Sequence, residues 1–476
     1  MKKAIFLLLC GMSFGIAAAV HAQGLHATMF VKVVDAEPQD SLGAFFYPYK
    51  LKVIQDFDIR PLSCDTLSLK LENFSFFQTL RAEGESDFAL IPDMNVCSRN
   101  GQAPYHDTDY TFDGANLSIP VPADAATHIR IEYGYYSDLC FRTHIVPMGC
   151  GLLQYDFGWN SWYFKGDDGH VEFDKVAFDI PDTVCFFING ESIAEADGTV
   201  SLDLAQHRYD DISFHIADKK WYDPHPVRIG DIRCDLLLSK RDTSEVENEI
   251  PVPLAQLPDS LIADRKERIG RIIRSLHGLF PESKAEEFTI LEDDLRTEDE
   301  KYAYGRAVHM SDREHAVFID RSYWLDPSLT HELVHCFLNY NYDRIDARYF
   351  FDESLIEYFA NYVYYPDPNE RDEAFAAKLE YFENLPGDKD ISIFDISRNY
   401  VDTRSGDGTH GIVYHKVPAR IHEFAQKIGT ERFHEAVRKF NLRLEQGDAP
   451  DFEDFGRILR DSGVSEEDWL QFVRSI

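Results

Sequence analysis

Hydrophobic and polar residues alternate along much of the chain between residues 23 and 239. Leu67, Leu69 and Leu71, for example, are separated by single polar residues. The same alternation recurs in Ile129–Tyr133, Val171–Ile180, Val200–Leu204 and Ile212–Ile216. A period of two residues predicts strands with one buried face, and short runs separated by Gly, Asp, Asn and Pro predict antiparallel neighbours. We therefore expect an antiparallel β-sandwich-like domain over residues 23–245.

The pattern changes at residues 240–258, where charged residues and prolines are concentrated. We interpret this segment as a domain boundary and place the boundary at residue 245. Beyond it, Ile269, Ile272 and Leu276 have the spacing of an amphipathic helix.

Three short strands are expected after that helix, followed by a mostly helical segment. The strands are predicted at Phe288–Leu291, Ala307–Met310 and Ala316–Ile319. Residues 408–476 have the helical period, with Gly429 as a stop between two helices. Residues 246–476 are thus expected to form an α+β domain.

The first 22 residues have the pattern of a secretory signal peptide. Lys2 and Lys3 precede an apolar run, and small residues lie before a cleavage site near Ala22 and Gln23. The run is shorter than the ~20 residues that a membrane span needs. No later segment is long and apolar enough to span a bilayer. We expect an exported protein, periplasmic or extracellular.

The formal net charge of −35 limits the partners that the protein can bind. A chain this acidic repels the phosphate backbone of nucleic acids, which excludes nucleic-acid binding as a function class. Its 476 residues exceed what a single hydrophobic core usually serves. We expect a multidomain protein with an acidic surface.

Six of the eight cysteines lie in the first half of the chain after the signal peptide: Cys64, Cys97, Cys140, Cys150, Cys185 and Cys234. In an oxidising compartment these six residues can form up to three disulfides, whose connectivity the sequence leaves open. Cys336 stands next to His335 and is expected to be a buried free thiol.

The motif His331-Glu332-Leu333-Val334-His335 carries the first candidate chemistry. On a helix, residues i and i+4 lie on one face, one turn apart. Two imidazoles placed in this way can bind one Zn²⁺, and Glu332 then points at the open position of the metal. The pentapeptide predicts a zinc site with a catalytic glutamate.

A second helical motif follows after 17 intervening residues. Glu353 and Glu357 are again i and i+4, among aromatic and aliphatic residues that are expected to be buried. Two antiparallel helices would bring Glu353 to the free side of the metal. Two His and one carboxylate leave a fourth position for water, which is typical of catalytic zinc. Glu357 is expected either to orient His331 or to be a surface carboxylate.

These motifs resemble those of the gluzincin zinc metallopeptidases, above all the aminopeptidase N family and its shorter bacterial relatives. The hallmark of that family is HExxH followed by a helix carrying Glu-Gly-Leu-Ala-Glu-Tyr. This chain has Glu353-Ser354-Leu355-Ile356-Glu357-Tyr358, with Ser354 in place of the Gly. The resemblance implies a thermolysin-like catalytic domain over residues 246–476, with ligand helices over residues 327–365 and one Zn²⁺ per chain.

Two further segments resemble the family. A family segment of the form Tyr-x-Lys-Gly-Ala corresponds to Tyr414-His415-Lys416-Val417-Pro418. The resemblance implies that Tyr414 donates a hydrogen bond to the oxyanion, and His410 is a second candidate for that role. Pro418 departs from the family pattern and is expected to bend the start of the helix. In the β half, Val171–Glu191 is similar to a family strand that runs into Asn-Gly-Glu.

One family feature is missing from the sequence. The aminopeptidases carry a strand of the type Gly-Ala-Met-Glu-Asn, whose glutamate binds the free α-amine of the substrate. The corresponding stretch here is Gly305–Met310 and has no glutamate. We therefore favour an endopeptidase that accepts longer peptides or whole proteins.

The sequence predicts an exported zinc metallopeptidase that hydrolyses peptide bonds with Glu332 as general base and a zinc-bound water. His331, His335 and Glu353 are the expected ligands. One alternative is an aminopeptidase with an atypical amine anchor, for example Glu298 or Asp299. The other is a noncatalytic binding protein built on a peptidase scaffold.

Overall fold

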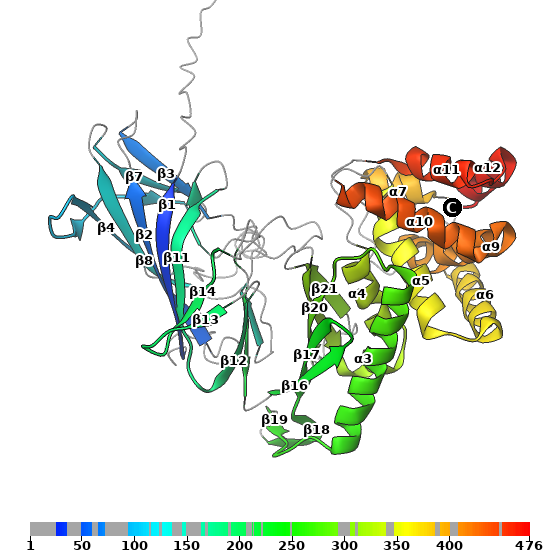
Figure 1. Cartoon of the computed structure of the whole chain (residues 1–476), viewed down its shortest axis with the longest axis horizontal. Helices are drawn as coiled ribbons and strands as arrows, with labels where there is room; N and C mark the ends of the chain where they lie inside the picture. The colour runs from blue at the N-terminus through cyan, green and yellow to red at the C-terminus, as the bar shows by residue number, and fades with distance from the viewer. Residues whose placement is uncertain are drawn as a thin grey trace, which may run out of the picture.

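The computed structural model describes most of the chain after residue 24. The described residues are 25–35, 49–59, 65–71, 94–113, 116–122, 126–135, 145–148, 163–166, 170–188, 192–205, 212, 214–219, 222–247, 250–293, 305–309, 313–338, 347–385, 391–399, 408–446 and 450–476. The predicted signal peptide and the Asn-Gly-Glu segment at residues 189–191 lie outside them. Figure 1 shows a strand-rich N-terminal part and a C-terminal part dominated by helices.

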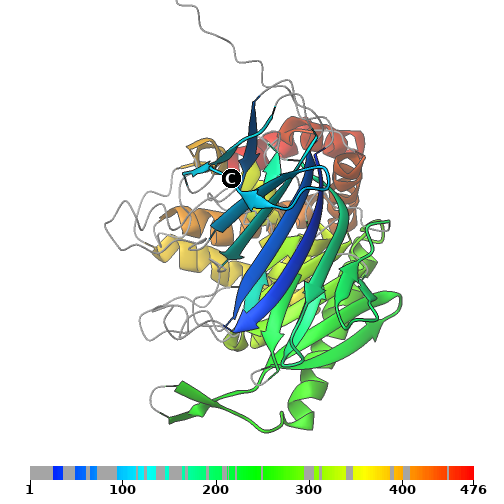
Figure 2. The same cartoon turned by 90° about the vertical axis from the view of Figure 1, so that its left-hand side faces the viewer.

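The N-terminal part is built around an eight-stranded sheet, which Figure 2 shows from its strand-rich side. The strand order is β13-β14-β11-β1-β2-β8-β4-β5. In that order the strands are Ser192–Ala194, Val200–Leu202, Glu172–Asp179, His26–Asp35, Tyr49–Ile59, Thr127–Tyr135, Met94–Asn100 and His106–Asp107. All neighbours are antiparallel except β1 and β11, which pair in parallel. The expectation of a purely antiparallel domain was therefore wrong at this one pair.

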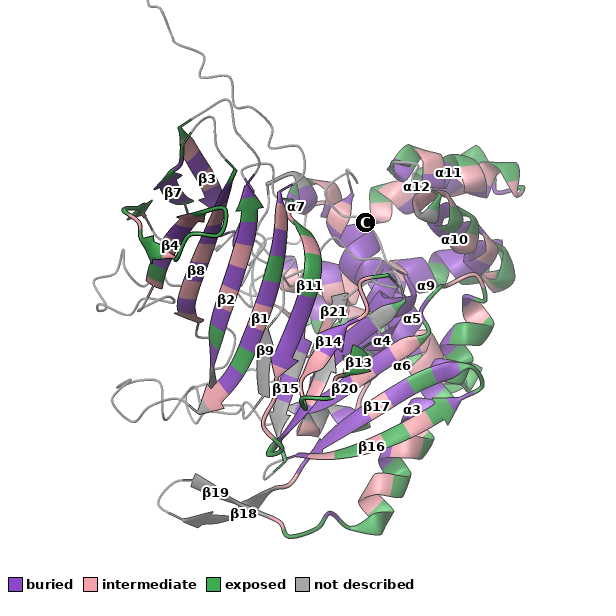
Figure 3. Cartoon of the chain, turned by 60° about the vertical axis from the view of Figure 1, so that its left-hand side comes forward, coloured by how far each residue is buried: buried purple, intermediate pink, exposed green. Residues whose placement is uncertain are grey.

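Two smaller sheets complete the N-terminal part. The order β10-β3-β7-β6 joins Lys165–Gly166, Thr66–Lys70, Asn116–Pro120 and Thr111–Phe112, and the order β12-β15-β9 joins Val184–Ile188, Phe214–Asp218 and Ile145–Met148. Leu67, Leu69, Ile129 and Ile131 are all buried, although they lie in two different sheets, and they belong to one core. Figure 3 shows the resulting alternation of buried and exposed residues along the strands. The period-two prediction is confirmed for these strands.

The sequence-based boundary at residue 245 falls in the wrong place. Strands β16 (Tyr222–Ile229) and β17 (Ile232–Ser239) belong to a five-stranded sheet with the order β16-β17-β20-β22-β21. Its other members are β20 (Glu287–Asp293), β22 (Glu314–Asp320) and β21 (Gly305–His309). The three central strands are parallel and β21 is an antiparallel edge. The two hydrophobic cores thus divide between Ile216 and Ile229.

The reason for this error lies in the charged and proline-rich segment itself. It forms an antiparallel hairpin of β18 (Arg241–Glu247) and β19 (Ile250–Pro253). Its composition therefore marks a hairpin that follows β17, and not a boundary between domains. The central strand β17 contains Leu236, Leu237 and Leu238, which are all buried. A continuous apolar run is typical of a parallel strand covered on both faces.

Helices cover this sheet and continue to the end of the chain. They include the long α3 (Asp259–Leu279), the 3₁₀ turn η1 (Arg321–Leu325), α4 (Ser328–Phe337), the π-helical turn η3 (Phe350–Ser354) and α5 (Leu355–Tyr364). Then follow α6 (Pro368–Asn384), α7 (Ile393–Asn399), α8 (Gly408–Gly411), the π-helical turn η5 (Ile412–Lys416), α9 (Val417–Ile428), α10 (Thr430–Glu445), α11 (Phe452–Asp461) and α12 (Glu466–Ser475). Gly429 has φ 97° and separates α9 from α10, as predicted.

The cysteines in the described residues are free thiols. Cys97, Cys185 and Cys234 make no disulfide, so the three disulfides that six cysteines allow are not formed at these residues. Cys185 and Cys234 are buried within strands, where a thiol serves as a small apolar side chain. Cys64, Cys140 and Cys150 lie outside the described residues. Cys336 is a buried free thiol, as expected.

Gly411 allows α6 to approach the segment that carries Tyr414. A Cβ added at Gly411 would fall well inside contact distance of Leu385 Cδ1 and 3.2 Å from Phe382 Cδ2. Both side chains come from the C-terminal end of α6. Any residue larger than glycine would force the side chains of Leu385 and Phe382 to shift from their present positions.

We predict that Gly411→Ala lowers the free energy of unfolding by about 1–3 kcal/mol, the usual effect of an overpacked core position. Gly278→Ala is the matched control, because Gly278 is exposed on α3 and an added Cβ meets nothing within 4 Å. That variant should be neutral or more stable by up to ~1 kcal/mol, since alanine favours helix. Denaturant unfolding of both variants makes the comparison. Equal effects of the two substitutions would contradict the steric explanation.

Candidate metal centre

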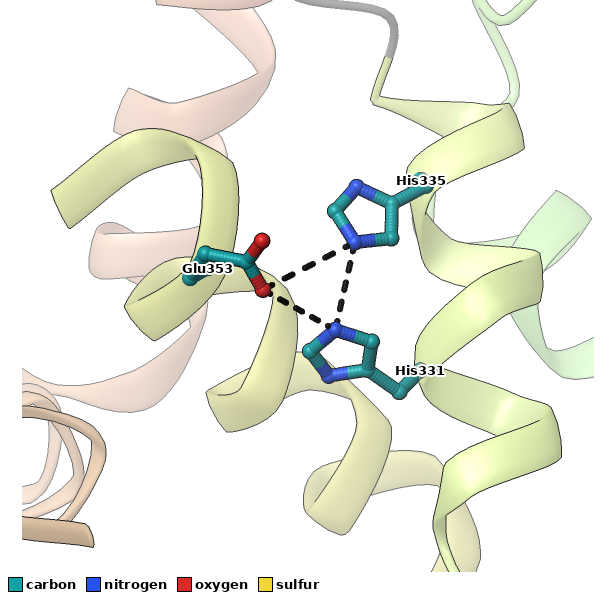
Figure 4. A group of neighbouring side chains, drawn as sticks. All are labelled: His331, His335 and Glu353. Atoms are coloured by element: carbon teal, nitrogen blue, oxygen red, sulfur yellow. Dashed lines mark hydrogen bonds and ion pairs between the residues drawn. The ribbon is translucent and has the colours of Figure 1, made fainter. Parts of the chain in front are cut away.

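Three side chains converge in the helical part, as Figure 4 shows. His331 Nε2 lies 3.1 Å from His335 Nε2 and 3.3 Å from Glu353 Oε2, and His335 Nε2 lies 4.0 Å from the same oxygen. All three residues are buried, and their donor atoms lie within 4.8 Å of one another. The structure thus brings together the three ligands predicted from the sequence.

Two packed helices produce this arrangement. His331 and His335 lie one turn apart on α4, and α4 packs against α5, which η3 precedes. Phe351 stacks on Phe440 of α10 with ring centroids 4.6 Å apart, and Phe350 meets Phe452 of α11 edge-on at 5.0 Å. These aromatic contacts fix the π-helical turn that carries Glu353.

Glu357 is buried behind His331 and is not a surface carboxylate. Its Oε2 accepts a hydrogen bond of 2.7 Å from Nδ1 of His331. A histidine that donates through Nδ1 presents the lone pair of Nε2 to a metal. Of the two expectations for Glu357, the structure supports the one in which it orients His331.

Asp352 and Arg348 lie close to His335 and were missed by the sequence reasoning. Asp352 Oδ1 lies 3.8 Å from Nδ1 of His335, and Asp352 Oδ2 lies 3.8 Å from Nε of Arg348. Asp352 therefore lies beside Nδ1 of His335, as Glu357 lies beside Nδ1 of His331, but at a longer distance. The signal that could have revealed it is its position directly before Glu353, in a run that the sequence already marked as buried.

Lys378 was also missed. Its Nζ donates to Oε1 of Glu357 at 2.7 Å, and Nδ2 of Asn361 donates to the same oxygen at 2.8 Å. Burial by itself raises the pKa of the Glu357 carboxyl, but Lys378 and His331 outweigh this and hold it well below its usual range. No local motif marks Lys378, because it lies on α6 and reaches the site only through tertiary packing.

Tyr414 lies on η5 at the edge of the same cluster. Its ring centroid is 6.1 Å from that of His331, and its hydroxyl hydrogen-bonds to Glu353. Burial and the neighbouring Glu353 carboxylate raise the pKa of Tyr414 well above its ordinary value. The phenol therefore stays protonated, and can donate, at neutral pH.

His410 faces Tyr414. The two ring centroids are 4.6 Å apart and the ring planes form an angle of 34°. His410 also lies 5.9 Å from the ring of His415. The structure therefore places this second candidate against the tyrosine on the side of α8.

The two departures from the family pattern have structural roles. The hydroxyl of Ser354, which replaces a glycine, donates to the carbonyl of Val413 at 2.7 Å and so ties η3 to η5. Pro418 lies in the first turn of α9, immediately after the π-helical turn that carries Tyr414. Pro418 thus lies where π-helical winding changes to α-helical winding.

The charges at the site fit a divalent cation. Four carboxylates, Glu332, Asp352, Glu353 and Glu357, are each no more than 9% exposed. The ammonium of Lys378 pairs with Glu357, and the guanidinium of Arg348 lies beside Asp352. Two imidazoles and a carboxylate, with further acidic groups beside them, are the donor set that a catalytic Zn²⁺ prefers.

The edge strand β21 runs beside the helix that carries His331 and His335, and it supplies no carboxylate that could bind a substrate amine. It pairs with β22 and contacts α4. Its sequence, Gly305–His309, contains no carboxylate. Glu298 and Asp299, the alternative anchors considered from the sequence, lie outside the described residues.

Comparisons with known proteins give matches in fold but not in sequence. No family model matches the chain, and no curated protein is similar enough in sequence to match it. Among solved structures, an aminopeptidase N family protein from Idiomarina loihiensis aligns over 94% of this chain and 76% of its own, with 10% identity and TM-score 0.62.

Two further solved structures with a similar fold are M1 zinc metallopeptidases. A two-domain M1 zinc metallopeptidase bound to L-arginine aligns over 94% of both chains, with 12% identity and TM-score 0.50. An M1 zinc metallopeptidase from Deinococcus radiodurans aligns over 95% of both chains, with 12% identity and TM-score 0.49. The resemblance predicted from the motifs is confirmed for the fold: this chain has the multidomain architecture of the aminopeptidase N family, a β-rich N-terminal part followed by a helical part.

Proposed function

We propose that the protein is a zinc metallopeptidase. The observation that carries the proposal is the convergence of His331, His335 and Glu353 within 4.8 Å on two buried, packed helices. The fold shared with the aminopeptidase N family supports the same function. A bound Zn²⁺ would polarise the scissile carbonyl and acidify water.

The residues around the ligands supply the remaining chemistry. Glu332 follows the first histidine of the motif and acts as the general base, taking a proton from the attacking water and passing it to the leaving amine. Tyr414 donates its hydroxyl hydrogen to the oxyanion that develops on the substrate carbonyl. Glu357 keeps His331 in the tautomer that binds metal through Nε2.

The first prediction separates metal binding from proton transfer. Glu332→Gln should keep about one zinc per chain and lose peptide hydrolysis by several orders of magnitude, because it removes the base and spares the ligands. His331→Ala should lose the zinc itself. Elemental analysis and a peptide-cleavage assay measure the two properties. A wild-type protein without zinc, grown with ample metal, would contradict the function, and an active Glu332→Gln would contradict the role of Glu332 alone.

A second prediction concerns Tyr414. Tyr414→Phe should lower kcat by about 10²–10³ with little change in KM, since the hydroxyl acts on the transition state. Steady-state kinetics on one peptide are sufficient. If only KM rises, Tyr414 binds substrate, and His410 becomes the better candidate for the oxyanion.

The position of the cut is proposed separately. One solved structure with this fold is named an aminopeptidase N family protein, which favours removal of N-terminal residues. The lack of a carboxylate in β21 favours endopeptidase cleavage, because an aminopeptidase needs a fixed negative group to pair with the ammonium of the substrate. We retain the endopeptidase as the proposal, with an aminopeptidase that uses another anchor as the alternative.

Acetylation of a substrate distinguishes the two modes. An endopeptidase should cleave an acetylated peptide within about tenfold of the free one, roughly 1.4 kcal/mol in transition-state binding. Product masses recorded over time give both the rate and the site of cleavage. Stepwise loss of single residues from the free peptide alone would establish the aminopeptidase.

The proposed setting is outside the cytoplasm, on the basis of the signal-peptide pattern in residues 1–22. Among the described residues, no helix has the length and apolar character needed to cross a bilayer. The proposed partner is a peptide or protein substrate. A noncatalytic binding protein remains the second candidate, and the zinc and cleavage assays above also test it.

A further inference from the structure

Lys378 connects two parts of the site that come from different segments. It lies on α6, and its side chain is 17% exposed. Its Nζ is 2.7 Å from Oε1 of Glu357 on α5 and 3.4 Å from the main-chain oxygen of Tyr414 on η5. One ammonium group therefore contacts both the carboxylate that orients His331 and the backbone that carries the proposed oxyanion donor.

The contact with Tyr414 follows from the sequence around it. In an α-helix the carbonyl of residue 414 would accept a hydrogen bond from the amide of residue 418. Residue 418 is proline, which has no N–H and whose ring crowds that carbonyl. The chain takes a π-helical turn at Ile412–Lys416 instead. Lys378 donates to the carbonyl of Tyr414, to which Pro418 cannot donate because it has no N–H.

The contact with Glu357 is directional as well as electrostatic. Glu357 uses one oxygen for His331 and the other for Lys378 and Asn361, so both lone-pair regions of the carboxylate are engaged. The carboxylate plane, and with it the His331 ring, is thereby fixed from behind. Outer hydrogen bonds of this kind commonly change metal affinity by about 10–100-fold.

We propose that Lys378 is a positioning residue that couples the metal ligand His331, through Glu357, to the oxyanion donor Tyr414, through its backbone. The inference rests on the proposed function. It differs from a simple stabilising role, because a buried ion pair often contributes little net stability once desolvation is counted. It also differs from a simple charge effect, because an ammonium near the site repels Zn²⁺.

The direction in which zinc affinity changes in Lys378→Met distinguishes a positioning role from a charge effect. If Lys378 acts only through its charge, Lys378→Met should tighten zinc binding. If it positions Glu357, the same change should weaken zinc binding by about 10-fold or more. The zinc dissociation constant of the full-length protein is measured by competition with a chelator. Lys378→Gln is made in parallel, because its polar side chain protects against a folding failure at this partly buried position.

The second readout is turnover at saturating zinc. With zinc restored, Lys378→Met should still show kcat lowered by about threefold or more with KM little changed, because the backbone of Tyr414 has lost its contact. Lys378→Arg, which keeps a cationic donor, should recover part of both effects. Lys427→Met is the matched control, since Lys427 makes an ion pair of the same 2.7 Å length with Asp468 on the exposed surface. It should change neither property.

Zinc binding as tight as in the wild type, or tighter, in folded Lys378→Met or Lys378→Gln would overturn the inference. A normal kcat at saturating zinc would overturn the coupling to Tyr414. A wild-type protein that binds no zinc would instead refute the proposed function, so the two failures are distinguishable.

Discussion

The helical part depends on placing four carboxylates inside an apolar core. Glu332, Asp352, Glu353 and Glu357 have lost most of their hydration, and each such loss costs several kcal/mol unless partners compensate for it. The compensation determines what must be nearby: two imidazoles on α4, a guanidinium ahead of η3 and an ammonium from α6. Helices distant in sequence are thus held together by charge as well as by packing.

Sequence reasoning was most successful where chemistry is encoded locally. The spacing of His331 and His335 places them on adjacent turns of one helix, Glu353 follows on the next helical segment, and the structure brings their donor atoms together. The period of two also identified the strands containing Leu67 and Ile129. The domain boundary was harder to predict, because a charged, proline-rich hairpin looks the same as a linker at the level of composition. Membership of β16 and β17 in the five-stranded sheet is decided by long-range pairing of β17 with β20, and the apolar run Leu236–Leu238 is its only local sign in these two strands.

The residues that support the site were predictable only in part. Glu357 was a candidate because it shares a helix face with Glu353, but its alternative as a surface group could be dismissed only once α4 was seen packed against α5. Asp352 and Arg348 lie close to the motif, yet nothing in their spacing indicates the direction of their side chains. Lys378 lies 21 positions beyond Glu357, one helix later, and no rule of periodicity connects the two. The residues that would bind the metal lie in short sequence motifs, whereas the residues that hold them in place come from several parts of the chain.

The two π-helical turns, Phe350–Ser354 and Ile412–Lys416, have a consequence for sequence length. A π turn contains about one residue more than the α turn it replaces, and one residue rotates a helix by roughly 100°. Deleting a single residue within either turn could therefore relax it to ordinary α winding without breaking the helix. The side chains before the deletion would then point a quarter-turn or more away from their present direction relative to those after it. In these two turns the number of residues, as well as their type, sets the directions of Glu353 and Tyr414.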